Sequence, residues 1–362
     1  MAGRSVRISP RGPARPGAPL AVADVDGSPL WFRSGSPLRP SVEAFASAAL
    51  PSSLLTDRPL ELDRPVSATW LTGARAIGDV MHEWWGFHRV DPAVAAIVPD
   101  DDAAQRAPAA APAAAPTRRV ALCFSGGVDS FHALLTEPGV SVLVSALGFD
   151  IPLADRTRWR AWRRSLDAIG RNTGVRVVTV ATNVRTHPFA SLAPWPMSHG
   201  GALAALGHLL TPGVDELLVS ASYPRAMPDA RWGSHWRLDH HWSSGSLRVR
   251  HVGADLWRAE KLAAIADHQL VRDHLRVCWE LTSAGLNCGT CEKCVRTQLV
   301  LARLGCLDAF TVFPRRPLGE SIDRLPRLRN PDLADVYAGF AADAAPPVRA
   351  AVDRLLQRSE AP

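Results

Sequence analysis

The sequence predicts an α/β protein built on a parallel sheet, and three features of its 362 residues carry this prediction. Short apolar runs alternate with helical patterns through the middle of the chain, as in strand–helix–strand units with parallel strands. A Gly-Gly turn joins the first of these runs to a helix, and a proline-rich segment separates them from an N-terminal region. In such folds ligands bind at the carboxyl ends of the strands, so functional residues are expected there.

The N-terminal region, residues 1–102, is expected to form a small α+β domain of its own. Residues 19–33 alternate apolar and polar side chains around Asp26-Gly27, which predicts a β-hairpin. Residues 70–87 carry apolar side chains at helical spacing, which predicts a helix. Tryptophans on this helix serve either as core side chains or as a surface for stacking bases, and the core is the commoner use.

Residues 103–117 are rich in alanine and proline and are expected to form an extended linker. The parallel sheet is expected in residues 118–310, and a helical tail in residues 311–362. The predicted strands are residues 120–124, 140–147, 175–180 and 214–220, and the predicted helices are residues 129–135, 155–169 and 200–210.

The charge balance and the cysteine placement limit the classes of function. Lysine and arginine exceed aspartate and glutamate by 41 to 35, a mild excess that permits contact with nucleic acid without indicating it. No apolar run is long enough for a membrane span, and no secretory leader pattern opens the chain. Four of the six cysteines fall within residues 278–294, which favours metal binding in a reducing compartment. We therefore expect a cytoplasmic protein with no membrane partner.

A glycine-rich turn after the first predicted strand is the candidate phosphate site. Residues 125–130 read Ser-Gly-Gly-Val-Asp-Ser, and a predicted helix follows. The two glycines let the backbone approach a ligand closely, and the helix N-terminus directs N–H groups at an anion. No lysine lies nearby, and the glycine spacing differs from the dinucleotide fingerprint. A plain turn with Asp129 or Ser130 as helix cap is the alternative.

Four cysteines form the candidate metal site. Their spacing, C-x₉-C-x₂-C-x₂-C, supplies the four thiolates of a tetrahedral zinc site. The predicted ligands are Cys278, Cys288, Cys291 and Cys294. A helix predicted over residues 292–304 begins inside the cluster, so a bound ion would stabilise it. An iron–sulfur cluster and four unrelated buried cysteines are the alternatives, and Cys123 and Cys306 are expected to be small apolar side chains.

Together these features resemble the 7-cyano-7-deazaguanine synthase family of PP-loop ATP pyrophosphatases, within the adenine nucleotide α-hydrolase superfamily. The similar parts span residues 118–306: the Ser-Gly-Gly-x-Asp-Ser loop, then Arg258-Ala259-Glu260 at a helix start, then the four cysteines. The resemblance implies a HUP-like, Rossmann-like fold and a C–N ligase that forms AMP and pyrophosphate. The implied reaction converts a 7-carboxy-7-deazaguanine to its amide and nitrile, as in queuosine-type biosynthesis. ATP, Mg²⁺ and Zn²⁺ are the implied cofactors, with a small-molecule substrate and an ammonia donor as partners.

The resemblance also implies roles for individual residues. The implied nucleotide-binding residues are Phe124, Ser125, Gly126, Gly127, Val128, Asp129, Ser130, Phe131, His132, Ala133 and Leu134. The implied catalytic residues are Ser125, Asp129, Ser130, Arg258 and Lys261. Arg258 stands where the family has lysine, and Lys261, one turn later, can serve as the phosphate cation. A charged helix surface is the alternative for both.

Two segments depart from the family pattern. Residues 148–152 replace a Tyr-Gly-Gln segment, and residues 233–244 crowd histidines, tryptophans and an aspartate into one stretch. The candidate substrate contacts there are Phe149, Asp150, His235 and Asp239. His235 or Asp239 would act in proton transfer or in a second metal site, and an ordered but inert loop is the alternative.

The sequence is also compatible with two other functions. One is a tRNA-modifying PP-loop enzyme that activates a base for thiolation or a lysidine-like reaction. The other is a nucleotide-binding adaptor without turnover, in which the N-terminal region meets a partner. The sequence leaves open the substrate, the choice of nitrogen or sulfur donor, and the oligomeric state, a homodimer included.

Overall fold

A mostly parallel sheet organises the computed structural model, which describes residues 5–11, 18–100, 119–328 and 333–360. The contacts divide the chain into two units. Unit 1 comprises Met1–Phe124, Thr136–Ala154 and Gly170–Asp255, and unit 2 comprises Ser125–Leu135, Asp155–Ile169 and Leu256–Pro362. The predicted α/β class is confirmed, whereas the predicted linker, residues 103–117, lies outside the described residues.

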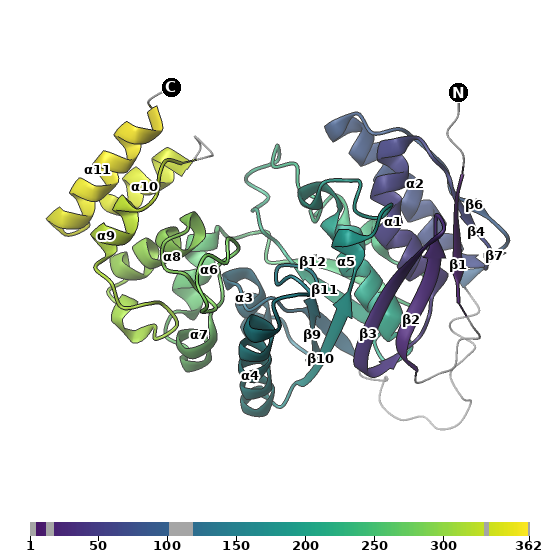
Figure 1. Ribbon diagram of the computed structural model, residues 1–362, viewed down its shortest axis with the longest axis horizontal. Coiled ribbons are helices and arrows are strands. Elements are labelled where there is room, and N and C mark those ends of the chain that lie inside the picture. The colour runs from purple at the N-terminus through teal and green to yellow at the C-terminus, as the bar shows by residue number, and fades with distance from the viewer. Residues whose placement is uncertain (1–4, 12–17, 101–118, 329–332, 361–362) are drawn as a thin grey trace. The chain divides into compact units, whose positions relative to one another are not determined.

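Unit 1 contains a ten-stranded sheet with the strand order β12-β11-β8-β9-β10-β3-β2-β1-β4-β6 (Figure 1). Its strands are β1 (Val6–Pro10), β2 (Ala18–Val25), β3 (Ser28–Leu38), β4 (Leu60–Leu62), β6 (Ala93–Val94), β8 (Val120–Cys123), β9 (Val140–Leu147), β10 (Arg176–Thr182), β11 (Glu216–Ser220) and β12 (Arg248–Val252). Two further strands, β5 (Val66–Ser67) and β7 (Ile97–Val98), form a separate pair.

Strands β12, β11, β8, β9 and β10 all run parallel, and β8, β9, β10 and β11 correspond to the four strands predicted in this region. Their apolar runs are buried, as a parallel sheet requires. The sequence did not predict β12, because its five residues include two arginines and a histidine beside only two valines. In the sheet, His251 of β12 lies beside Val219 of β11.

The N-terminal region differs from the separate domain predicted for residues 1–102. The predicted hairpin is present as β2 and β3, but β3 also pairs with β10 in antiparallel fashion, Thr182 opposite Phe32. The hairpin thus extends the central sheet and covers the hydrogen-bonding edge of β10. A hairpin pattern is local, so it cannot show which strand the hairpin's outer edge will join.

Three helices share the main hydrophobic core of unit 1: α1 (Val42–Thr56), α2 (Ala68–Trp85) and α5 (Trp195–Leu210). Figure 1 shows α1 and α5 side by side. They approach closely, because a Cβ atom on Gly201 would lie 2.2 Å from the Ser47 carbonyl oxygen. Trp70 and Trp84 of α2 are buried, which favours the core interpretation of these tryptophans. Short 3₁₀ helices, η2 (Val184–Thr186) and η3 (Asp239–Trp242), follow β10 and precede β12.

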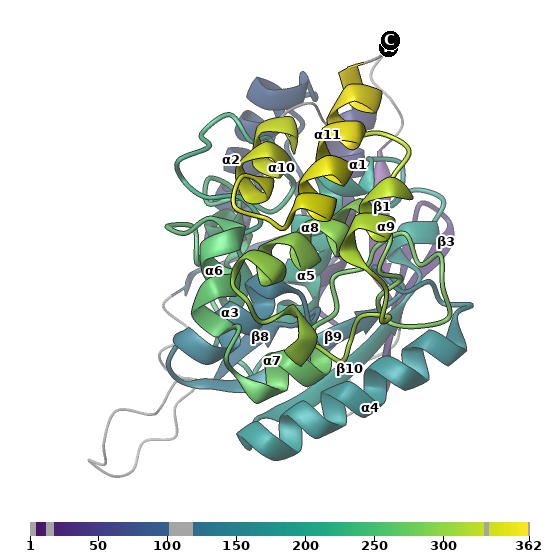
Figure 2. The same cartoon turned by 90° about the vertical axis from the view of Figure 1, so that its left-hand side faces the viewer.

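The remaining helices lie wholly or mostly in unit 2. They are α3 (Val128–Thr136), α4 (Arg156–Thr173), α6 (Arg258–Ile265), α7 (Gln269–His274), α8 (Glu292–Arg303), α9 (Leu318–Asp323), α10 (Leu333–Ala341) and α11 (Pro346–Glu360), with the 3₁₀ helix η4 (Leu307–Ala309). Figure 2 shows α9, α10 and α11 gathered beside α8, where they share a second hydrophobic cluster around Tyr337. No helix among the described residues is long and apolar enough to cross a membrane.

Candidate functional site

The glycine-rich loop of residues 125–130 leads into α3 within unit 2. Gly126 has φ of +75°, and a Cβ atom there would lie 2.2 Å from the Trp162 ring. Trp162 is buried on α4 and cannot move aside easily. Only glycine fits this position without strain, so the tight backbone that the sequence predicted is present.

The loop serines bond within the loop itself. The Gly127 N–H donates to Ser125 Oγ at 3.2 Å, and Ser130 Oγ donates to the Gly127 carbonyl oxygen at 3.1 Å. The two hydroxyl oxygens lie 3.4 Å apart. Ser125 and Ser130 therefore present hydroxyl groups at one turn, next to the N-terminus of α3.

Arg276 holds the loop in place, and no pattern in the sequence identifies it. Its backbone N–H donates to the Gly126 carbonyl oxygen at 2.8 Å, and its Nε donates to the Ser125 carbonyl oxygen at 3.1 Å. Its guanidinium lies 5.5 Å from the centre of the Trp162 ring. In a chain with 39 arginines, no pattern distinguishes this one, because its partners are fixed only by the fold.

The predicted catalytic side chains of α3 and α6 come together in unit 2. Arg258 forms an ion pair with one oxygen of Asp129, and Lys261 Nζ lies 3.3 Å from the other. Lys261 is only 1% exposed. With Arg276, three cationic side chains lie at the loop, and Asp129 is the carboxylate that pairs with two of them. Cationic side chains next to the N–H groups of a helix N-terminus are suited to an anion.

The four predicted metal ligands converge. All four Sγ atoms lie within 4.8 Å of one another, with 3.8 Å between Cys278 and Cys291 and 3.9 Å between Cys288 and Cys294. Zinc–sulfur bonds of about 2.3 Å in a tetrahedron place sulfurs roughly 3.8 Å apart. The cluster can therefore hold one metal ion, and zinc fits. A four-iron cluster, in which each thiolate binds a different iron, needs a wider spacing.

Neighbouring groups fix the geometry of the thiolates. The Cys291 N–H donates to Cys288 Sγ at 3.2 Å across a turn in which Gly289 has φ of +76°. Asn287, buried beside the cluster, accepts from the N–H groups of Val277 and Cys278 at 2.8 and 3.2 Å. These contacts orient the ligands as outer-shell groups do in metal sites. The sequence did not identify Asn287.

The two cysteines outside the cluster have a different character. Burial raises the pKa of the Cys123 thiol, and the nearby Asp239 carboxylate raises it further. A thiol in such surroundings stays protonated and unreactive. Cys123 thus agrees with the expected buried apolar side chain, whereas Cys306 is partly exposed.

His235 and Asp239, predicted as substrate contacts, belong to one hydrogen-bonded group in unit 1. Asp239 accepts from Ser234 Oγ at 2.7 Å and from the His235 N–H at 3.3 Å. Asp239 also lies 2.7 Å from Nδ1 of His251, a residue the sequence did not identify. Burial, together with the neighbouring His251, lowers the pKa of His235 to about 4. A carboxylate that orients an imidazole is typical of acid–base pairs.

The other two predicted substrate residues follow β9. Gly148 has φ of +99°, and a Cβ atom there would lie 2.0 Å from the Thr182 carbonyl oxygen, so glycine lets the ends of β9 and β10 approach. Phe149 is buried with its ring 5.0 Å from that of Trp195, and Asp150 follows on the exposed side. The four candidate substrate residues thus fall into two groups of contacts in unit 1.

Comparison of the chain with protein-family models, curated proteins and solved structures finds no match. Two findings stand on the structure alone: the α/β fold with its mostly parallel sheet, and a four-cysteine group that can bind a metal ion. The activity must be argued from the chemistry of the loop and its cations.

Proposed function

We propose that this chain is an ATP-dependent adenylating enzyme of the PP-loop type, a C–N ligase that activates a carboxylate or amide and releases AMP and pyrophosphate. The observation that carries the proposal is the loop of residues 125–130 with Arg258, Lys261 and Arg276 around it. The 7-deazaguanine acids of the related synthases are the first substrates to test, with ammonia as the attacking nitrogen.

The polar groups of the loop suit a polyphosphate. The N–H groups at the start of α3 and the hydroxyls of Ser125 and Ser130 supply donors, while the cations supply charge. Lys261 is a compact point charge held in place by burial, which suits a phosphoryl oxygen. In the proposal these groups hold the pyrophosphate that leaves when the substrate oxygen attacks the α-phosphorus.

The metals have separate roles in the proposal. Four thiolates complete a tetrahedral shell and leave no open position, so zinc at the cysteine cluster is structural. Mg²⁺ would enter with ATP, since it usually binds substrate phosphates and one or two carboxylates. Asp129 is the carboxylate at the loop, and its pairing with Arg258 and Lys261 would have to loosen for it to bind the ion.

The test is release of AMP and pyrophosphate from ATP by the full chain with 7-deazaguanine acids and ammonium. Ser130→Ala should lower the rate of AMP formation at least about tenfold, because it removes a donor at the leaving phosphate. Ser141→Ala is the matched control, since Ser141 bonds to the Val120 carbonyl oxygen outside the loop. ATP binding without AMP release would instead support the nucleotide-binding adaptor. Equal rates for Ser130→Ala and the control would reject the proposed loop function.

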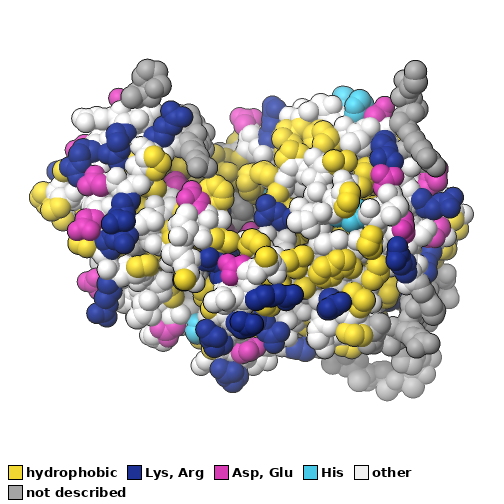
Figure 3. Space-filling view, viewed as in Figure 1, with side chains coloured by type: hydrophobic (Ala, Val, Ile, Leu, Met, Phe, Trp, Pro, Cys, Tyr) yellow, Lys and Arg dark blue, Asp and Glu magenta, His cyan; other side chains and the backbone are white. Residues whose placement is uncertain are grey.

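A second candidate, modification of tRNA, is favoured by one surface. Helix α4 exposes five arginines, and Figure 3 shows dark-blue side chains gathered around its position. They are Arg156, Arg160, Arg163, Arg164 and Arg171. A basic helix face can follow a phosphate backbone, and the binding it supports weakens steeply with salt. Salt-dependent tRNA binding that is lost in an α4 arginine-to-glutamine variant would favour this candidate over the first.

A further inference from the structure

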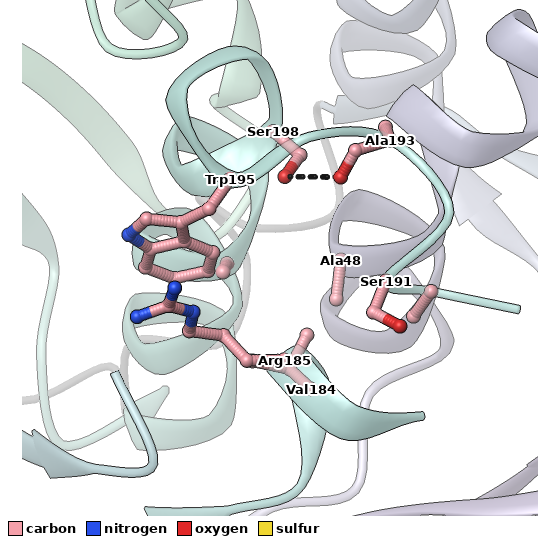
Figure 4. A pocket seen from close by; sticks show the side chains of 9 residues that line it. Ala48, Val184, Arg185, Ser191, Ala193, Trp195 and Ser198 are labelled. Atoms are coloured by element: carbon pink, nitrogen blue, oxygen red, sulfur yellow. Dashed lines mark hydrogen bonds between the residues drawn. The ribbon is translucent and has the colours of Figure 1, made fainter. Parts of the chain in front are cut away.

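A cavity of about 190 Å³ lies in unit 1 beyond the carboxyl end of β10 (Figure 4). Helix η2 borders it on one side, the first turns of α5 on another, and α1 contributes Ala48. Because ligands of parallel sheets bind beyond the carboxyl ends of the strands, this position is suited to a ligand site. None of the residues predicted from the sequence lines it.

Small apolar side chains belong to five of the nine residues that line the cavity. Its apolar members are Ala48, Val184, Ala190, Ala193 and Ala202. The backbones of α1 and α5 approach closely near the cavity. The space remains because alanines line it, where larger side chains would fill it. The indole ring of Trp195 closes one side, with Phe149 packed against it at 5.0 Å. These surfaces are suited to the apolar or aromatic body of a small molecule.

One charged side chain, Arg185, is present among the residues that line the cavity. Its guanidinium lies 4.8 Å from the centre of the Trp195 ring, and Figure 4 shows the two groups facing each other. One N–H donates to the Phe149 carbonyl oxygen at 2.8 Å, which fixes the orientation of the guanidinium. A guanidinium has five N–H donors, so others are available to a ligand.

The two serines of the wall cannot replace the arginine as donors. Ser191 Oγ donates to the His187 carbonyl oxygen at 2.7 Å, and Ser198 Oγ donates to that of Ala193 at 3.2 Å. Arg185 therefore sets the charge preference of the cavity. A guanidinium that lies over an aromatic ring is suited to an anion that it can bind through two parallel hydrogen bonds.

We infer that this cavity binds a small ligand with one anionic group, carboxylate or phosphate, on an apolar or aromatic body. Arg185 binds the anionic group, while Trp195 and the alanines contact the body. The segment of residues 148–152, which departs from the resembled family, supports this site from outside the wall, because Phe149 packs against Trp195 and accepts a hydrogen bond from Arg185. The inference does not require the proposed adenylation, because binding here is measured without ATP.

The experiment titrates the full chain with benzoate, phenyl phosphate and benzamide at low salt, by calorimetry and by protein NMR. Either anion or both should bind saturably and more tightly than neutral benzamide, and their relative affinity distinguishes carboxylate from phosphate. Arg185→Gln should weaken the anion at least about tenfold, since a charge-assisted bidentate contact is lost. Arg33→Gln is the matched control, because Arg33 also lies over a tryptophan, 5.9 Å from the Trp31 ring, and does not line the cavity.

A second variant tests the location. Ser191→Leu fills the cavity from an exposed position, so it should abolish binding while the melting temperature stays near that of the wild type. Retained binding in Ser191→Leu would overturn the inference. So would equal affinity for benzamide and the anions, an unchanged affinity in Arg185→Gln, or the absence of saturable binding of both anions.

Discussion

At the scale of single residues, the buried charge of Arg158 is expected to contribute strongly to the stability of unit 2. Arg158 is only 6% exposed and donates to the carbonyl oxygens of Leu281, Ser283 and Gly285, besides its ion pair with Asp155. Arg158→Ala should lower the free energy of unfolding of unit 2 by about 3 kcal/mol, because the buried guanidinium's ion pair and its three hydrogen bonds to part-buried carbonyl groups are lost. Denaturant titration measures this loss.

The control for this prediction lies on the same helix. Arg160→Ala removes an exposed arginine and should change the free energy of unfolding by less than about 0.5 kcal/mol. Arg158→Lys should recover only part of the loss, since a lysine cannot bind three carbonyl groups with a rigid fork. Equal stability of the Arg158 and Arg160 alanine variants would show that the three carbonyl contacts carry no energy.

The second residue-scale prediction concerns Gly126. Gly126→Ala brings a methyl group against Trp162 and should reduce ATP binding by tenfold or more, because the loop must shift. Gly139→Ala is matched in backbone conformation, with φ of +77°, but a Cβ atom there meets open space. It should cost about 1 to 2 kcal/mol of stability and leave ATP binding unchanged. Similar ATP affinities of the two variants, measured by calorimetry, would contradict the role of the loop.

The sequence predicted this loop because glycines and serines next to a strand and a helix form a local pattern. It could not predict Arg276 or Trp162, which reach the loop from segments far apart in the chain. The cysteine cluster was predictable for the same reason as the loop, since three of its four ligands lie within seven residues. Asn287 escaped notice, because an asparagine in a loop carries no signal of its own.

At the scale of elements, the metal site and α8 depend on each other. Cys291 is the residue at the N-cap position of α8, and Cys294 lies in its first turn, so an ion bound to both would fix where the helix starts. Removing the metal with a chelator should therefore expose the amides of α8 to hydrogen exchange, while the amides of β8 to β11 stay protected. Exchange followed by mass spectrometry measures both segments in one experiment.

Two variants give the control for metal removal. Cys294→Ser should reproduce the loss of protection in α8 and lower the bound zinc. Cys306→Ser, which changes a cysteine outside the cluster, should keep one zinc per chain and normal protection. If α8 stays protected when the metal content has fallen to zero, the site is not a folding element.

The strands whose residues are mostly apolar were predicted from the sequence, and the strand that carries charged residues was not. The runs that form β8 to β11 are rich in valine, leucine and alanine, so their apolar character alone marks them. In β12 the arginine side chains form ion pairs, Arg250 with Glu137 and Glu216, and these partners allow charged residues in a strand. Pairings of this kind depend on the fold, so the local pattern of β12 resembled a loop.

At the scale of the whole molecule, the main difference from prediction is the extent of the sheet. Proline-rich residues 103–117 suggested a boundary between domains, yet strands from both sides of this segment share one sheet. The composition of a segment predicts only the conformation of that segment. Strand pairing depends instead on which strand edges, often distant in sequence, meet in the fold. The cavity beside Arg185 was unpredictable for a related reason, since its wall combines residues of α1, η2 and α5.

Acidification should destabilise unit 1 as a whole, because several of its histidines are buried. Burial lowers the pKa of His235 to about 4, and burial also lowers the pKa values of His187, His208 and His241. In the unfolded chain a histidine titrates near pH 6.5, so between about pH 6.5 and 4 the unfolded state binds protons that the native state does not. The free energy of unfolding is therefore greatest above pH 7 and falls as the solution is acidified through this window.

His235 alone should contribute up to about 3 kcal/mol to this fall, since its pKa of about 4 lies some 2.5 units below the unfolded value. His235→Asn removes the titrating ring, so unfolding free energies measured at pH 7, 6 and 5 should fall less steeply for the variant than for the wild type. The comparison uses slopes, so any constant loss of stability in the variant does not affect it. Parallel slopes would show that His235 reaches solvent and takes up its proton before the chain unfolds.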